Sequence, residues 1–197
     1  MPKINKLVYD EKRKFIMDTA RQVFSERGYE GATIKDILVA AGISNGGLFV
    51  YFKTKRDILL AIIDQNLGTF HKRVEAVVEI AHEHSRDEVM LMLLELVRQI
   101  SLGPGRAMSL HAWSAAMVDP LVKECVDKHF NALIQSFSVL ARRLHAHGQL
   151  GPETNPTRAA HAMFSLVIPG YILQLLMFSS MEPRTYLNAH RSVWCTN

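Results

Sequence analysis

The chain has 197 residues, of which 48% are hydrophobic and 21% are charged, a balance typical of folded proteins and unlike disordered ones. Its length permits one domain, or a small domain joined to a larger one. No apolar run approaches the roughly 18 residues of a membrane span, and no apolar signal core follows the basic start. We therefore expect a cytoplasmic protein with no membrane partner.

The positive charge of the chain is concentrated at its beginning. Residues 1–56 carry 11 Lys and Arg against 6 Asp and Glu, whereas residues 57–197 carry 12 against 13. A basic region of this kind is the electrostatic footprint expected for contact with nucleic-acid phosphates. A basic segment that is merely solvated remains the alternative at this point.

Apolar residues recur at helical spacing along the whole chain, and no segment alternates in the manner of a strand. The expected fold class is therefore all-α. We expect about nine helices, at residues 11–27, 33–42, 44–51, 55–84, 86–101, 108–118, 120–147, 156–179 and 183–194. Asp10 is expected to cap the first helix and Gly28 to end it. Pro169-Gly170 falls inside a helical pattern and predicts a kink.

The second and third predicted helices form a helix-turn-helix. They are joined by Ala41-Gly42-Ile43, where Gly42 allows the left-handed backbone of a tight turn. Ser44 can cap the third helix, whose first turn then presents Asn45 outward, where the major groove of DNA would accept it.

Two consecutive glycines at the start of this third helix are unusual. Gly46 and Gly47 each disfavour the helix by about 1 kcal/mol relative to alanine. Close approach of the helix backbone to DNA would explain them. The alternative is that the segment is a loop, but Leu48, Phe49 and Phe52 at helical spacing argue against it.

Residues 33–59 resemble the DNA-binding signature of the tetracycline-repressor (TetR) family. The matching positions follow a first helix that ends in the phrase Phe24-Ser25-Glu26-Arg27-Gly28-Tyr29, and the similarity covers about residues 10–63. They are Thr33, Ile37, Ala41-Gly42-Ile43-Ser44, Gly46, Leu48-Phe49, Tyr51-Phe52-Lys53, Lys55 and Ile58-Leu59. The resemblance implies a regulator with an N-terminal three-helix DNA-binding domain and a larger helical bundle for ligand binding and dimerisation.

The resemblance also implies a role in DNA binding for particular residues. Phosphate contacts are expected from Thr33, Tyr51 and Lys55. Contacts with base edges or nearby backbone are expected from Lys35, Ser44, Asn45, Gly46 and Gly47. Phe49 stands where the family more often has tyrosine, so a contact there lacks the hydroxyl.

We expect two domains, a helix-turn-helix domain over residues 1–54 and a ligand-binding and dimerisation domain over residues 55–197. Aromatic, methionine and polar side chains on the later helices are candidates for an apolar effector pocket, although such stripes more often form plain core. The candidates are Trp113, Met117, Phe130, Phe137, Phe164, Tyr171 and Gln174.

By the same resemblance, the expected partners are a double-stranded operator with an inverted repeat, a small-molecule effector and a second copy of the chain. The last two helices would pair with their copies in the second subunit. Ala159, Ala160, Met163 and Val167 would suit that close packing.

Neither a metal site nor a cofactor is expected. Cys125 and Cys195 lie far apart, and Cys125 with His129 forms only an i, i+4 pair with no third ligand evident. No Ser/His/Asp arrangement or nucleotide loop indicates an enzyme. The predicted function is a ligand-responsive repressor, released by a small, largely apolar effector. The alternative is an interaction module of the same fold without sequence-specific DNA binding.

Overall fold

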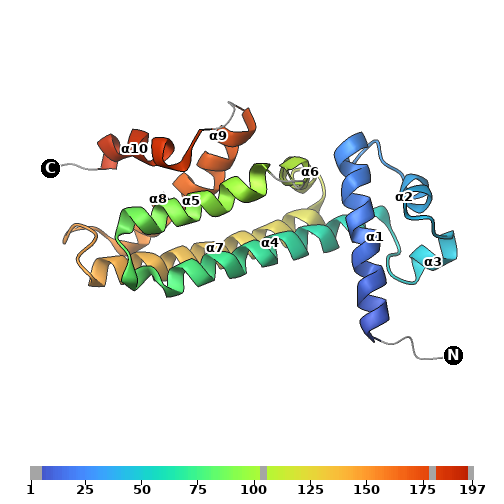
Figure 1. Cartoon of the computed structure of the whole chain (residues 1–197), viewed down its shortest axis with the longest axis horizontal. Helices are drawn as coiled ribbons and strands as arrows, with labels where there is room; N and C mark the ends of the chain where they lie inside the picture. The colour runs from blue at the N-terminus through green and yellow to red at the C-terminus, as the bar shows by residue number, and fades with distance from the viewer. Residues whose placement is uncertain (1–5, 103–105, 178–180, 195–197) are drawn as a thin grey trace. The chain divides into compact units, whose positions relative to one another are not determined.

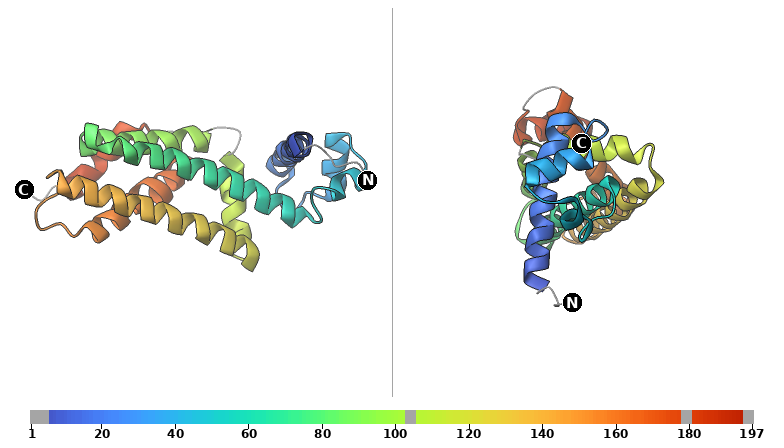
Figure 2. Two further views of the ribbon diagram at one scale, coloured as in Figure 1. Left: turned by 90° about the horizontal axis from the view of Figure 1, so that it is seen from below. Right: turned by 90° about the vertical axis from the view of Figure 1, so that its right-hand side faces the viewer.

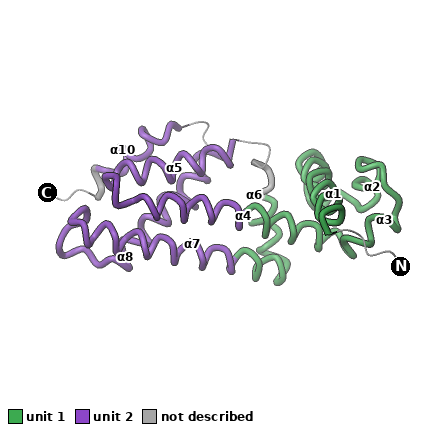
Figure 3. The backbone as a smooth tube through the Cα atoms, turned by 60° about the horizontal axis from the view of Figure 1, so that its bottom comes forward, with its two compact units in different colours: residues 1–66, 107–126 green, residues 67–106, 127–197 purple. Residues whose placement is uncertain are grey.

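The computed structural model describes residues 6–102, 106–177 and 181–194, and within them all regular structure is helical (Figure 1). The chain forms two compact units, residues 1–66 with 107–126 (unit 1) and residues 67–106 with 127–197 (unit 2; Figure 3). Unit 1 therefore includes the start of the fourth helix and residues 107–126. The predicted boundary at 54/55 would assign both of these segments to the second domain. The functional division at that boundary stays a prediction.

Unit 1 begins with α1 (Lys6–Arg27), followed by α2 (Ile34–Ala41) and α3 (Asn45–Phe49) (Figure 1). The predicted start of α1 is wrong, because Asp10 lies inside the helix rather than at its cap. Tyr9 explains the longer helix, since its ring packs 4.7 Å from the ring of Tyr51 and holds the first turns against the protein. The predicted end is confirmed at Gly28, whose φ of 72° is left-handed.

The core of unit 1 is an apolar cluster from α1 to the beginning of α4 (Lys55–Glu79). On α1 it uses one face, with Ile16 and Phe24 buried, whereas the neighbouring Phe15 is 51% exposed. Other fully buried members are Ile37, Leu48, Ile58, Leu59 and Ile62. The same unit contains α6 (Arg106–Ala116) and the start of α7 (Pro120–Ala146).

Unit 2 is a helical bundle. The second half of α4 lies beside α7 (Figure 2), and Arg143 of α7 donates a hydrogen bond of 2.5 Å to the carbonyl of Val78. A short 3₁₀ turn (Ala81–Glu83) leads into α5 (Arg86–Leu102), which packs against the last two helical segments of the chain. The sequence predicted one helix over residues 55–84, but α4 ends at Glu79.

The predicted helix at 156–179 is broken in the way that its proline suggests. It consists of α8 (Pro156–Ser165), a π-helical turn (η2, Leu166–Gly170) and α9 (Tyr171–Met177). Because Pro169 has no backbone N–H, the regular ladder is interrupted and one wider turn takes its place. Residues 178–180, including the predicted end at Ser179, lie outside the described residues. When this broken helix is counted as one, the described chain has nine helices.

The chain ends in α10 (Pro183–Trp194), which matches the predicted bounds. Residues 156–176 form a helix long and apolar enough to cross a membrane, with a mean hydropathy of 1.5 and 39% of the window buried. Core helices of water-soluble proteins meet the same criterion, so this segment alone does not indicate a membrane protein.

Candidate nucleic-acid interface

The first helix of the motif, α2, is held by a capping box at its N-terminus. Thr33 Oγ1 accepts a hydrogen bond of 3.2 Å from the backbone of Asp36, and the Asp36 carboxylate accepts one of 2.9 Å from the Thr33 backbone. Hydrogen bonds from Thr33 lower the pKa of Asp36 below its usual value. Arg27 also pairs with Asp36, at 3.0 Å. The exposed Thr33 therefore orders the helix end itself, beside any contact with phosphate.

The turn between α2 and α3 depends on Gly42. Its φ is 62° and ψ is 32°, and its N–H points back to the carbonyls of Leu38 and Val39. This left-handed conformation is accessible to glycine with little strain. It stops α2 and sets the direction in which α3 begins, as the sequence predicted.

The start of α3 is an open surface. Ser44 Oγ accepts a hydrogen bond of 3.2 Å from Gly47 N, which confirms the predicted cap, and Leu48 is buried. Asn45 and Gly46 are exposed, and no heavy atom lies within 4 Å of the place that a Gly46 Cβ would occupy. An unobstructed backbone with one exposed amide side chain is suited to entering the major groove.

The remaining residues that are predicted to contact DNA differ in their solvent exposure and in the contacts that they already make within the protein. Lys35 is exposed, and Phe49 is 36% exposed. The ring of Tyr51 is half-buried against Tyr9. The Lys55 ammonium donates to the backbone carbonyls of Tyr29 (2.7 Å), Ala32 (3.0 Å) and Glu30 (3.4 Å). Its hydrogen-bonding capacity is thus used within the protein, so its predicted phosphate role remains a prediction.

The structure adds a groove that the sequence did not reveal. A cavity of about 490 Å³ lies between α1 and the motif, and its lining includes Lys12 and Phe15 of α1 together with Gly47 and Tyr51. Local spacing pairs residues within one helix, so it gives no sign that Lys12 lies beside the third helix of the motif. Lys53 was also missed as a candidate. It is an exposed cation whose Nζ donates to the carbonyl of Phe49 at 2.7 Å.

The seven candidate effector residues come from both compact units. Trp113 and Met117 belong to unit 1, where Met117 is 86% exposed. In unit 2, the ring of Phe164 packs edge-on against Phe130 at 6.0 Å and against Phe137 at 5.8 Å. These three aromatic residues contribute to the packed interior, and their role in a pocket stays a prediction.

Tyr171 was chosen because a buried polar tip needs a partner, and the structure supplies that partner from within the chain. Its hydroxyl donates a hydrogen bond of 2.6 Å to the carbonyl of Met181. Burial raises the pKa of Tyr171 to about 12, so the hydroxyl stays a donor at neutral pH. Gln174 is only half-buried. Neither residue lines the described cavity of unit 2, which lies between α5, α8 and α10.

The prediction that four residues of the broken helix pack against a second subunit is wrong. Ala159, Ala160, Met163 and Val167 are all buried inside unit 2, at 9%, 0%, 5% and 0% exposure. Their spacing marks the inner face of the helix, which packs within the chain's own core. Small residues at helical spacing do not by themselves distinguish an intramolecular contact from a subunit contact.

One constellation in unit 2 has the composition of a hydrolytic triad without its geometry. His71 Nε2 lies 2.9 Å from Ser136 Oγ and 3.8 Å from a Glu75 carboxylate oxygen. A triad requires the acid at Nδ1, so that Nε2 is left to take the serine proton. Both partners here share the same nitrogen, and Ser136 is only 8% exposed. His71 and Ser136 therefore form a structural hydrogen bond between two packed helices.

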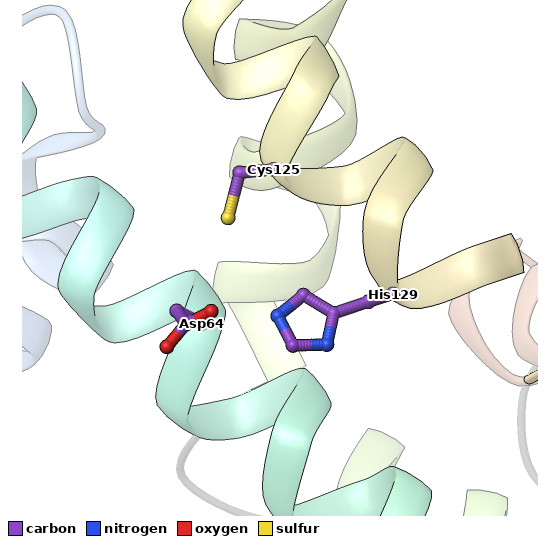
Figure 4. Close-up of side chains that lie close together, drawn as sticks. All are labelled: Asp64, Cys125 and His129. Carbon is purple, nitrogen blue, oxygen red and sulfur yellow. The ribbon is translucent and has the colours of Figure 1, made fainter. Parts of the chain in front are cut away.

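Cys125 of the cysteine and histidine pair on α7 has an acidic neighbour within unit 1. Figure 4 shows Cys125 and His129 on successive turns, and the ligand atoms of Asp64 and Cys125, both in unit 1, lie within 4.8 Å. Sequence spacing could not place Asp64, because it comes from α4. The three residues belong to two compact units, and we assign no metal to them. Cys195 lies outside the described residues.

Comparison with known proteins identifies a family match and several relatives. Residues 16–62 match the family described as bacterial regulatory proteins, tetR family. The HTH-type transcriptional repressor AcnR of Corynebacterium glutamicum is 26% identical over 170 residues, 86% of this chain and 85% of that protein. The fatty acid metabolism regulator protein of Bacillus subtilis is 37% identical over 60 residues, 30% of this chain and 31% of that protein.

Solved structures share the fold over nearly the whole chain. A TetR transcription regulator from Haloarcula marismortui superposes with a TM-score of 0.76 at 16% identity, covering 94% of this chain and 97% of that one. FadR from Bacillus subtilis in complex with stearoyl-CoA gives a TM-score of 0.71 at 15% identity, covering 93% and 97%. Together with the capped helix-turn-helix, the match of residues 16–62 to the family and the similarity to the repressor AcnR indicate a transcriptional regulator rather than an enzyme. The chain belongs to the TetR family of helix-turn-helix, DNA-binding transcriptional regulators.

Proposed function

We propose that this protein is a cytoplasmic, ligand-responsive repressor that binds an inverted-repeat operator as a homodimer. One observation carries the DNA-binding part. The first turn of α3 is capped by Ser44 and presents Asn45 and Gly46 without obstruction. The excess of positive charge in residues 1–56 supports phosphate contact around this surface.

The dimer part of the proposal concerns the outer faces of the last helices. Inward residues such as Ala160 are buried in the core, whereas Leu173 is 50% exposed and Leu176 is half-buried. Apolar surface on this outer side suits contact with a second copy. A twofold dimer in turn implies twofold symmetry in the DNA site.

The effector part of the proposal rests on a cavity in the helical bundle and on solved structures of similar fold that contain a bound ligand. FadR from Bacillus subtilis was solved with stearoyl-CoA, and a regulator from Saccharomonospora viridis was solved with choline. Unit 2 of this chain contains a cavity of about 310 Å³ with mostly apolar walls. A small, largely apolar effector that prefers a conformation unfavourable for DNA would release the operator by linkage.

Binding to promoter fragments from the protein's own locus tests the proposal. We expect a gel shift on a fragment that contains an inverted repeat, at a stoichiometry of one dimer or more per repeat. The affinity should fall steeply as salt rises, because phosphate contacts release counterions. Scrambling one half of the repeat should weaken binding strongly. Equal binding to scrambled DNA would instead favour the interaction module that lacks sequence specificity.

A further inference from the structure

The cavity of unit 2 has a chemical character that the sequence did not show. It has a volume of about 310 Å³, opens to solvent on one side and is bordered by α5, the loop after α7, α8 and α10. Its lining includes Met90, Ala159, Met163 and Leu187, which are 3%, 9%, 5% and 8% exposed. These side chains form an apolar floor that favours the hydrocarbon part of a ligand.

The volume limits the size of the occupant. Protein ligand pockets commonly measure about 300–1,000 Å³, so this cavity lies at the small end of that range. If each non-hydrogen atom fills about as much space as a water molecule in the liquid, roughly 30 Å³, the cavity holds on the order of ten such atoms. A medium-length alkyl chain or a single substituted ring would fill it.

The charged residues of the lining are unbalanced. Arg86 and Arg191 both pair with Asp87, Arg86 at 3.2 Å to one carboxylate oxygen and Arg191 at 2.6 Å to the other. Arg158 also lines the cavity, and among the described residues no acidic side chain lies within ion-pair distance of it. The lining therefore holds three arginines and one carboxylate, and it carries excess positive charge.

The geometry points to a binding site for a small amphiphile with an anionic head group and an apolar body of about ten non-hydrogen atoms. Arg158 binds the head group, because guanidinium matches both carboxylate and phosphate through paired N–H donors. Met163 and Leu187 contact the apolar body. Carboxylates and phosphate monoesters share this chemistry, and the test below distinguishes them.

Occupation of this cavity provides the effector response, an inference that rests on the proposed function. Its walls come from α8 and α10, the two helices proposed to meet a second copy. A ligand there changes the surface on which the two subunits pair. It thereby changes the distance between the two helix-turn-helix motifs of the dimer. By linkage, the ligand and the operator then weaken each other by the same factor.

Calorimetric titration of the full-length protein tests the site. The probes are octanoate, octyl phosphate, octan-1-ol and octylammonium, which share one chain and differ in head group. We expect both anions to bind about tenfold or more tightly than the alcohol and the cation. Whichever anion binds more tightly identifies the head group as carboxylate or phosphate. Equal binding of all four would overturn the charge argument.

Two variants place the ligand in this cavity. Arg158→Ala should weaken both anions about tenfold or more and leave octan-1-ol unchanged. The matched control is Arg142→Ala, which removes an exposed arginine of α7 that does not line the cavity. Ala162→Phe should fill the space and abolish binding of anions and alcohol alike. Anion affinities unchanged in Arg158→Ala would overturn the assignment.

Light scattering on the same samples separates a ligand site from a subunit contact. If the wild-type dimer binds no probe and Ala162→Phe dissociates it, the second copy occupies the cavity and the proposal is wrong. Operator binding separates the two levels of inference. Octanoate that binds without releasing the operator overturns the effector role only, whereas a wild-type protein that binds no inverted repeat overturns the proposed function itself.

Discussion

The Lys55 ammonium lies 2.7 Å from the backbone carbonyl oxygen of Tyr29 and 4.4 Å from the centre of the Tyr29 ring. The same group donates to the carbonyl of Ala32 at 3.0 Å. An ammonium has three N–H donors, and here they join the start of α4 to the connection between α1 and α2. Lys55 thereby holds the connection that leads into the helix-turn-helix, whatever contact it makes with DNA.

The first prediction follows from this contact. Lys55→Ala should lower the free energy of unfolding by about 1–3 kcal/mol, because charge-assisted hydrogen bonds to the carbonyls of Tyr29 and Ala32 are lost. It should also weaken binding to all DNA sequences alike. The exposed Lys35→Ala serves as control and should change stability by less than about 0.5 kcal/mol. If Lys55→Ala weakened DNA binding at unchanged stability, Lys55 would act chiefly as a phosphate ligand.

Asn45 should read a base. Its amide is exposed at the first turn of α3, so Asn45→Ala should shift base preference by about 1–3 kcal/mol at one position in each half-site. Selection from a randomised operator library measures this shift. Ser44→Ala offers a contrast, because loss of the cap should lower stability by about 1 kcal/mol. An unchanged preference in Asn45→Ala would remove this residue from the reading surface.

We expect the missing side chain of Gly46 to favour DNA binding rather than folding. No heavy atom would meet a Cβ there, so Gly46→Ala should stabilise the free protein by up to about 1 kcal/mol. Binding to the operator should nevertheless weaken, because the added methyl group separates the helix backbone from the groove. Denaturant unfolding and gel shifts on the same sample measure both effects. Stabilisation without weaker binding would show that DNA does not approach this backbone.

Gly170 should be essential to the broken helix. An added Cβ would lie 2.7 Å from the Tyr186 hydroxyl and 2.9 Å from the Ser165 carbonyl oxygen. Gly170→Ala should therefore destabilise the protein by about 1–3 kcal/mol, as overpacking does elsewhere. Combination with Tyr186→Phe, which removes the nearer of these two atoms, should recover part of the loss. Thermal unfolding of the single and double variants measures this coupling.

The capping box predicts a loss of stability in acid. Hydrogen bonds from Thr33 hold the pKa of Asp36 below its usual value, so its contribution is present above the unfolded pKa of about 3.9. That contribution is lost as pH falls through the lowered pKa. Denaturant unfolding between about pH 2 and pH 6 should show a shallower loss in Asp36→Asn and in Thr33→Ala than in the wild type. An unchanged slope would contradict this role.

Local sequence determined much of the fold. Helix ends are set by residues that act on their own backbone, so Gly28, Ser44 and Pro183 marked boundaries that the structure confirms. An irregularity at Pro169 was predictable for the same reason, because a missing N–H breaks the ladder whatever surrounds it. The helix-turn-helix was recognisable because its spacing lies within one short segment.

Tertiary structure decided which face of each helix is free and which cations have partners. Periodicity marked Ala159 and Met163 as an apolar face, but only packing showed that the chain's own core covers it. The three carbonyls around Lys55 come from residues more than twenty positions earlier in the chain. Arg158 likewise meets an apolar cavity together with residues of α5 and α10. Burial and electrostatics depend on distance in space, which local spacing along the chain does not determine.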